Sequence, residues 1–169
     1  REEKVATLQA DTHDSVGPGL YFVLLAGGYG CLDIANVSSR TVASFGVQSK
    51  MLMLIGRSVG FSVTIDSERD FNALDIGLNF EVAYTFDSAP IILTYNIGLG
   101  LASIFGSDEV VYPPFYSTGG NVLIRFDFIP SEFFQNFYLN AFLTIRYVAL
   151  EDHGALALFL IGFSVGYEL

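Results

Sequence analysis

Bulky apolar side chains recur at every second position through most of the second half of the chain. Between residues 71 and 86, Leu, Ile, Phe, Val and Tyr hold one parity, while Gly, Asn, Thr and acidic residues hold most of the other. A period of two is that of a β-strand, whose successive side chains point to opposite faces. The same pattern recurs four more times, between runs of Pro, Gly, Asp, Asn or Ser that are typical of turns. The strands predicted in this half are 71–86, 91–105, 122–128, 137–149 and the final run after residue 154.

Three further strands are predicted in the first half, at 19–30, 41–48 and 51–65. The last of them needs a bulge at Gly56-Arg57 to keep Arg57 off its apolar face. The total of eight antiparallel strands is even, so both chain ends leave on one side. Residues 1–16 are polar and are predicted to form a flexible N-terminal segment before a barrel that spans 17–169.

The composition excludes several classes of protein. No apolar run approaches the roughly 20 residues of a spanning helix, although the chain is 51% hydrophobic with a mean hydropathy of +0.48. A net charge of −10 repels the phosphates of nucleic acids, so no nucleic-acid partner is predicted. The single cysteine excludes an intrachain disulfide framework and a thiolate metal cluster. No cofactor and no metal site is predicted.

The size of an eight-stranded barrel indicates which face points outward. Its interior is just wide enough for its own side chains, so rows of Leu, Ile and Phe from every strand do not fit inside. An outward belt of these residues exceeds the apolar patch that soluble monomers tolerate, and lipid is the matching solvent. The sequence therefore predicts an all-β fold, an eight-stranded antiparallel transmembrane β-barrel. The alternative is a soluble barrel with its apolar face turned inward around a ligand.

The chain resembles the small eight-stranded outer-membrane barrels of the OmpX and OmpA type, with the OmpW family a looser match. The features that carry the resemblance are the alternating apolar pattern, the C-terminal strand and the short turns at 87–90 and 129–136. The resemblance implies a bacterial outer membrane, with its lipids and the barrel assembly machinery as partners. It also implies that the connections 67–70, 106–120 and 151–154 face the cell exterior. The residues that look like the assembly signal are Phe163, Val165, Tyr167 and Leu169, although that family normally ends in Phe.

Charged residues on the inward parity are candidates for a network that fills the lumen, because buried ions require partners. We expect Arg125 and Arg146 to pair with acidic residues across the lumen and to block it. The network acts either as a permanent plug or as a gate that opens by exchanging partners. The residues concerned are Asp75, Glu81, Arg125, Asp127 and Arg146, with Arg57 as a further candidate.

The predicted function is a non-enzymatic structural or surface role. His153 lacks a Ser or Thr at the strand spacing of two, where Ala155 stands, so no nucleophilic site is indicated. One alternative is an adhesin that contacts a host surface through the 106–120 loop, whose candidate binding residues are Tyr112, Pro113, Pro114, Phe115 and Tyr116. These rings equally fit the membrane interface. Another alternative is an OmpW-like narrow channel for small hydrophobic solutes, lined by Ile92, Ile104, Leu123, Phe142, Leu158 and Leu160.

Overall fold

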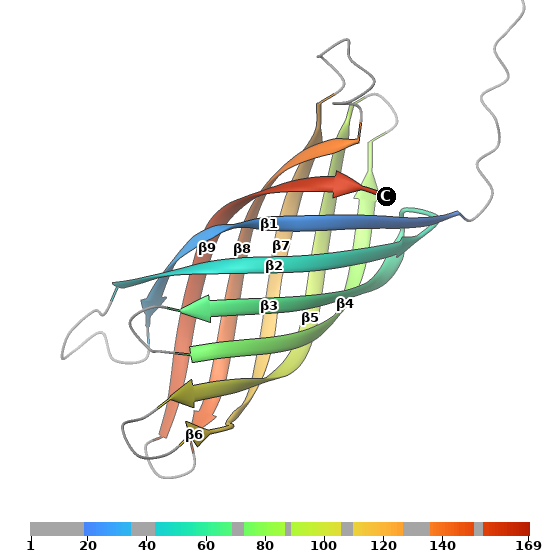
Figure 1. Cartoon of the computed structure of the whole chain (residues 1–169). Coiled ribbons are helices and arrows are strands. Elements are labelled where there is room, and N and C mark those ends of the chain that lie inside the picture. The colour runs from blue at the N-terminus through green and yellow to red at the C-terminus, as the bar shows by residue number, and fades with distance from the viewer. Residues whose placement is uncertain are drawn as a thin grey trace, which may run out of the picture.

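The computed structural model describes residues 19–34, 43–68, 73–86, 89–105, 110–126, 136–150 and 154–169, and these form one antiparallel sheet that closes on itself (Figure 1). The predicted N-terminal segment 1–16 lies outside the described residues. No helix long and apolar enough to cross a membrane occurs among the residues described. The strands are β1 Leu20–Asp33, β2 Ala43–Ile55, β3 Val59–Glu68, β4 Ala73–Thr85, β5 Ile91–Phe105, β6 Val110–Val111, β7 Pro114–Arg125, β8 Phe137–Leu150 and β9 Gly154–Glu168.

Closure joins the first and last strands of the chain. The order around the sheet is β4-β3-β2-β1-β9-β8-β7-β5-β6, and a further pairing of β4 with β5 completes the barrel. In Figure 1, β1 lies between β2 and the C-terminal β9. Both described chain ends, Gly19 and Leu169, lie at one end of the barrel, which we call the terminal end. The opposite end, where β1 stops and β9 starts, is the far end.

The short β6 belongs to the same barrel strand as β7. Ile104 pairs with Val111 and Leu101 pairs with Pro114, which is one continuous register. Between them, the amide of Ala102 still donates to the Pro113 carbonyl at 3.0 Å. The ladder is broken there because Pro113 and Pro114 have no backbone N–H. The barrel therefore has eight strands, and the predicted fold class is confirmed.

This strand corrects the predicted loop at 106–120. β7 begins at Pro114, so most of the second half of that range belongs to the barrel wall. The expectation was wrong because two successive prolines and three aromatic rings favour a loop by composition, whereas they here stand at the start of a long strand.

The bounds of two strands in the first half also differ from prediction. β2 is continuous through residues 48–51, and the chain reverses at 56–58 instead of bulging inside a strand. Gly56 and Arg57 have φ angles of 57° and 56°, and the Ser58 amide donates to the Ile55 carbonyl at 3.2 Å. Positive φ at both central residues is the type I′ pattern that favours tight hairpins. Gln48 and Lys50, at the boundary between the two predicted strands, both face the lumen.

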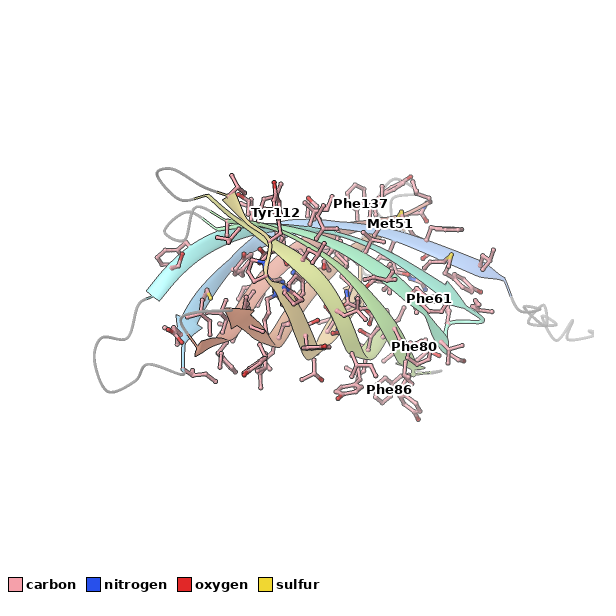
Figure 2. All side chains as sticks on the ribbon, turned by 90° about the horizontal axis from the view of Figure 1, so that it is seen from below. Met51, Phe61, Phe80, Phe86, Tyr112 and Phe137 are labelled. Atoms are coloured by element: carbon pink, nitrogen blue, oxygen red, sulfur yellow. The ribbon has the colours of Figure 1, made fainter. Side chains whose placement is uncertain are left out.

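Large apolar side chains cover the outside of the barrel (Figure 2), as the labelled Met51, Phe61 and Phe80 illustrate. Aromatic rings gather at both ends of this belt. At the terminal end, Tyr84 and Phe86 meet edge to face at 4.9 Å between ring centroids, and Phe137 and Tyr167 do so at 5.1 Å. The exposed rings toward the far end are Phe45, Tyr112, Tyr116 and Tyr147. Such aromatic girdles mark the two interfaces of a transmembrane barrel.

Inward glycines make room for the large rings inside. Gly100 pairs with Phe115 on one side and Gly77 on the other, and the Phe115 ring lies over both glycines. A Cβ atom added at Gly100 would stand 2.3 Å from Cζ of Phe115 and 2.2 Å from the Ile76 carbonyl oxygen. The wall is therefore closely packed at this point.

Replacing Gly100 with Ala is expected to lower the free energy of unfolding by about 1–3 kcal/mol, the usual cost of overpacking. The matched control is Gly30→Ala, because a Cβ atom there meets nothing within 4 Å. That change is expected to be neutral or to stabilise slightly, since Ala loses less backbone entropy than Gly. Urea titration in phospholipid vesicles, followed by far-ultraviolet circular dichroism, measures both. Equal effects of the two variants would contradict the packing described.

Candidate functional site in the barrel lumen

Inward side chains form one apolar cluster toward each end of the lumen and a polar zone that lies between and beside these clusters. The terminal cluster consists of Val23, Leu25, Leu52, Leu54, Ile92, Leu123 and Tyr138. The far cluster consists of Tyr29, Cys31, Ala102, Phe115, Phe142, Val148, Leu158 and Leu160. The lumen is therefore apolar toward both ends, where inward glycines leave space that large side chains fill.

Arg146 is the central cation of the polar zone. It projects from β8 and is 2% exposed, and it donates from Nη1 to Asp75 Oδ2 and from Nη2 to Asp66 Oδ2. Asp66 and Asp75 are paired neighbours on β3 and β4, so their carboxylates stand side by side. One planar guanidinium therefore serves two adjacent anions, a geometry that a lysine ammonium cannot reproduce.

Phe115 covers the guanidinium of Arg146. The Arg146 Cζ atom lies 4.4 Å from the centroid of the Phe115 ring, a cation–π contact shielded from water. Phe115 is 1% exposed. Its predicted place in an exposed binding loop is therefore wrong: it lies on the inward parity of β7. Pro113 is also buried, whereas Tyr112, Pro114 and Tyr116 are exposed.

A second ion pair lies in the same zone. Lys50 Nζ from β2 stands 2.6 Å from Glu81 Oε1 from β4, and both side chains are buried. The Ser62 hydroxyl donates to the same Glu81 oxygen at 2.6 Å. Asn79 Nδ2 donates to Ser62 Oγ at 3.2 Å, and Ser117 Oγ donates to Asn79 Oδ1 at 3.1 Å. A hydrogen-bonded chain thus crosses from β2 to β7.

The polar zone contains a small cavity. Lys50 and Arg146 both line its cavity, together with side chains such as Gln48, Asn96 and Thr144. The open space among them is about 10 Å³, roughly what one water molecule requires. This cavity has no room for a solute larger than water.

The predicted charged residues fall into two groups. Arg146 and Asp75 come together, and Glu81 lies nearby but is held by Lys50. Arg57 and Arg125 lie instead at the terminal end: Arg57 Nη2 is 3.7 Å from Glu168 Oε1, and Arg125 is opposite Tyr138 in the β7–β8 register. Asp127 lies outside the described residues.

Lys50 and Asp66 were not predicted as members of the network. Asp66 follows Ile65, the last residue of the predicted strand 51–65, and continuing that strand by one residue places Asp66 on the face opposite Ile65, inside the barrel. Lys50 was assigned to a gap between two strands, and extending the strand would have placed it on the inner face. The residue types of Lys50 and Asp66 were compatible with a place in the network. The two residues were missed because the predicted strands were too short.

The predicted assembly-signal residues Phe163, Val165, Tyr167 and Leu169 all lie on the outer face and form part of the belt. Their role in assembly stays a prediction. Among the described residues, no group of three or more His, Cys, Asp or Glu side chains could hold a metal ion. His153 lies outside those residues.

Solved outer-membrane proteins share this architecture. Neisserial surface protein A (NspA) superposes with a TM-score of 0.62 at 13% identity, over 89% of this chain and 97% of that one. The N-terminal β-barrel domain of Pseudomonas aeruginosa OprF gives 0.60 at 15%, over 88% and 97%. The attachment invasion locus protein Ail of Yersinia pestis gives 0.51 at 12%, over 88% and 98%.

No protein-family model matches the chain, and no curated protein matches its sequence. At identities this low, the solved structures show a shared fold: the eight-stranded transmembrane barrel of the OmpA and OmpX type. The predicted resemblance is confirmed at that level.

Replacing Arg146 with Ala is expected to lower the free energy of unfolding by about 3–5 kcal/mol, because two adjacent carboxylates lose their buried partner. Arg146→Lys keeps the charge but bridges less well, and is expected to fall between Arg146→Ala and the wild type. The variant Asp66→Asn, Asp75→Asn, Arg146→Ala removes all three charges and is expected to recover most of the loss. Urea titration in vesicles measures each. A triple variant no more stable than Arg146→Ala would contradict the ionic role of the cluster.

Proposed function

We propose that this eight-stranded transmembrane barrel resides in a bacterial outer membrane, where it acts as a non-enzymatic structural or surface protein with a blocked lumen. The observation that carries the proposal is the bridge from Arg146 to Asp66 and Asp75, which crosses the lumen beside the far cluster and is covered by its Phe115 ring. The belt of exposed apolar residues supports a location in lipid. The structural similarity to outer-membrane barrels supports the outer membrane as that location.

The plug form of the lumen network is favoured over the gate form. The Lys50–Glu81 and Arg146–Asp66–Asp75 groups each have their ions paired within the polar zone. Phe115 adds a ring against Arg146, so a change of partners has to displace it as well. Opening the passage further requires the apolar side chains at both ends to move.

The OmpW-like channel is less well supported. Its expected lining does not form one path: Ile92 and Leu123 belong to the terminal cluster, whereas Phe142, Leu158 and Leu160 belong to the far cluster. These side chains pack against one another and fill the ends of the lumen. The side chain of Ile104 lies outside the described part of the structure.

An adhesin remains the second candidate, now with a smaller contact surface. Tyr112 is 63% exposed toward the far end, the end that the resemblance directs to the cell exterior. Among the solved structures of this fold, Ail is an attachment invasion locus protein and NspA is a surface protein. Unchanged adherence of cells displaying Tyr112→Ala would count against this role.

The blocked lumen predicts that the wild-type protein shows no step-like conductance in planar bilayers. The cavity of the polar zone is too small, at about 10 Å³, for a hydrated ion. Tyr116→Ala, which truncates a lipid-facing neighbour of Phe115, is expected to be equally silent, because it leaves the lumen network in place. Openings in the wild type that grow on replacing Arg146 with Ala would support the gate and contradict the plug.

The proposed location predicts a defined pattern of cysteine labelling on intact Gram-negative cells. In a Cys31→Ala background, Tyr112→Cys at the far end is expected to react with a membrane-impermeant maleimide. Ser58→Cys, in the exposed turn at the terminal end, is the matched control and is expected to react only after the outer membrane is permeabilised. The reverse pattern would contradict the orientation, and recovery of the folded protein in the inner-membrane fraction would contradict the location.

A further inference from the structure

Three polar side chains from distant parts of the chain meet in the mouth of the terminal end. Arg57 comes from the turn between β2 and β3, Tyr138 from β8 and Glu168 from the end of β9. The Tyr138 hydroxyl donates to Glu168 Oε2 at 2.5 Å, and Arg57 Nη2 lies 3.7 Å from Glu168 Oε1. Glu168 thus links a buried tyrosine on one side to an arginine on the other.

The backbone of Arg57 indicates that its side chain is held by these contacts. Its φ angle of 56° lies in the left-handed region, which glycine adopts freely and other residues adopt at a cost. A glycine would satisfy the turn, so the arginine needs an offsetting interaction. The guanidinium Cζ atom lies 4.2 Å from the centroid of the Tyr21 ring on β1, in addition to the contact with Glu168.

These contacts span the seam where the barrel closes. β1 lies between the turn that carries Arg57 and the strand that carries Glu168, and Val23 is paired with Glu168 in the β1–β9 register. The backbone adds one bond on each side of β1: the Leu169 amide donates to the Phe22 carbonyl at 2.9 Å, and the Gly56 amide donates to the Gly19 carbonyl at 2.9 Å. Arg57 and Glu168 therefore come together only when β9 has paired with β1.

We propose that Arg57, Glu168 and Tyr138 form a clasp that locks the β1–β9 seam at the terminal end. Tyr138 is buried within the terminal cluster. Releasing Glu168 leaves the Tyr138 hydroxyl without this acceptor and opens the cluster beside it to water. The clasp thus connects strand pairing at the seam to the packing that closes this end of the lumen.

A double-mutant cycle on the full chain in vesicles tests the clasp, with amide hydrogen exchange of β1 and β9 as the readout. Arg57→Ala and Glu168→Gln are each expected to speed exchange at 21–25 and 164–168 by about two- to fivefold, the effect of losing a partly exposed ion pair. Exchange at 29–33 and 158–162 is expected to stay unchanged. The double variant is expected to resemble either single variant.

Ser58→Ala is the matched control, since its hydroxyl contacts only the Gly56 carbonyl of the same turn at 3.2 Å among the hydrogen bonds found there. It is expected to leave seam exchange unchanged. Tyr138→Phe keeps the ring in the terminal cluster and removes only the hydroxyl, so it tests the clasp even where a charge variant fails to fold. Additive effects of the two charge variants, or faster exchange spread evenly along β1 and β9, would overturn the proposal.

Discussion

A strand that crosses hydrocarbon has no water to satisfy its backbone, and each unpaired N–H or C=O group there costs several kcal/mol. The closed sheet follows from that requirement. The sheet has to close, so the first strand must find the last, and β1 pairs with β9 over nearly the whole length of both. Closure of eight strands then fixes an interior that is narrow, and the narrow interior decides which side chains face lipid.

The lumen is filled in different ways at different positions along the barrel. Where a large ring such as Phe115 enters the lumen, the facing positions are Gly77 and Gly100. Where no ring enters, hydrogen-bonding side chains such as Ser62, Asn79 and Ser117 cross the space. The buried ionic groups Lys50–Glu81 and Arg146–Asp66–Asp75 lie beside these side chains, where low exposure to water strengthens each attraction.

The alternation of apolar and polar residues was sufficient to predict the number of strands, which side chains face outward and the membrane environment. These properties depend only on side-chain size and on the two-residue period of a strand. It did not predict that β2 is continuous through residues 48–51, and so left Lys50 between two strands. It also could not assign partners across the lumen. Arg146 reaches Asp66 and Asp75 only because β8 faces β3 and β4 across the barrel, and that relation depends on strand tilt.

The stretch around Phe115 shows a different limit. Pro113 and Pro114 interrupt the hydrogen-bond ladder but leave its register intact, so the chain continues as wall where composition favours a loop. Proline is tolerated at the start of a strand near a rim, where fewer ladder bonds are lost. Whether an aromatic residue of this stretch faces the lumen or the lipid therefore depends only on whether its position is odd or even: Phe115 faces inward, and Tyr112 and Tyr116 face outward.

The paired aspartates restrict how this lineage varies. With Arg146 in place, losing one aspartate still leaves the cation a partner, whereas losing the arginine first leaves two like charges in contact. Mutational drift at the three positions consequently has a preferred order, in which an acidic residue is neutralised before the basic one. Chains descended from a common ancestor with this triad are then expected to retain the arginine longer than either carboxylate.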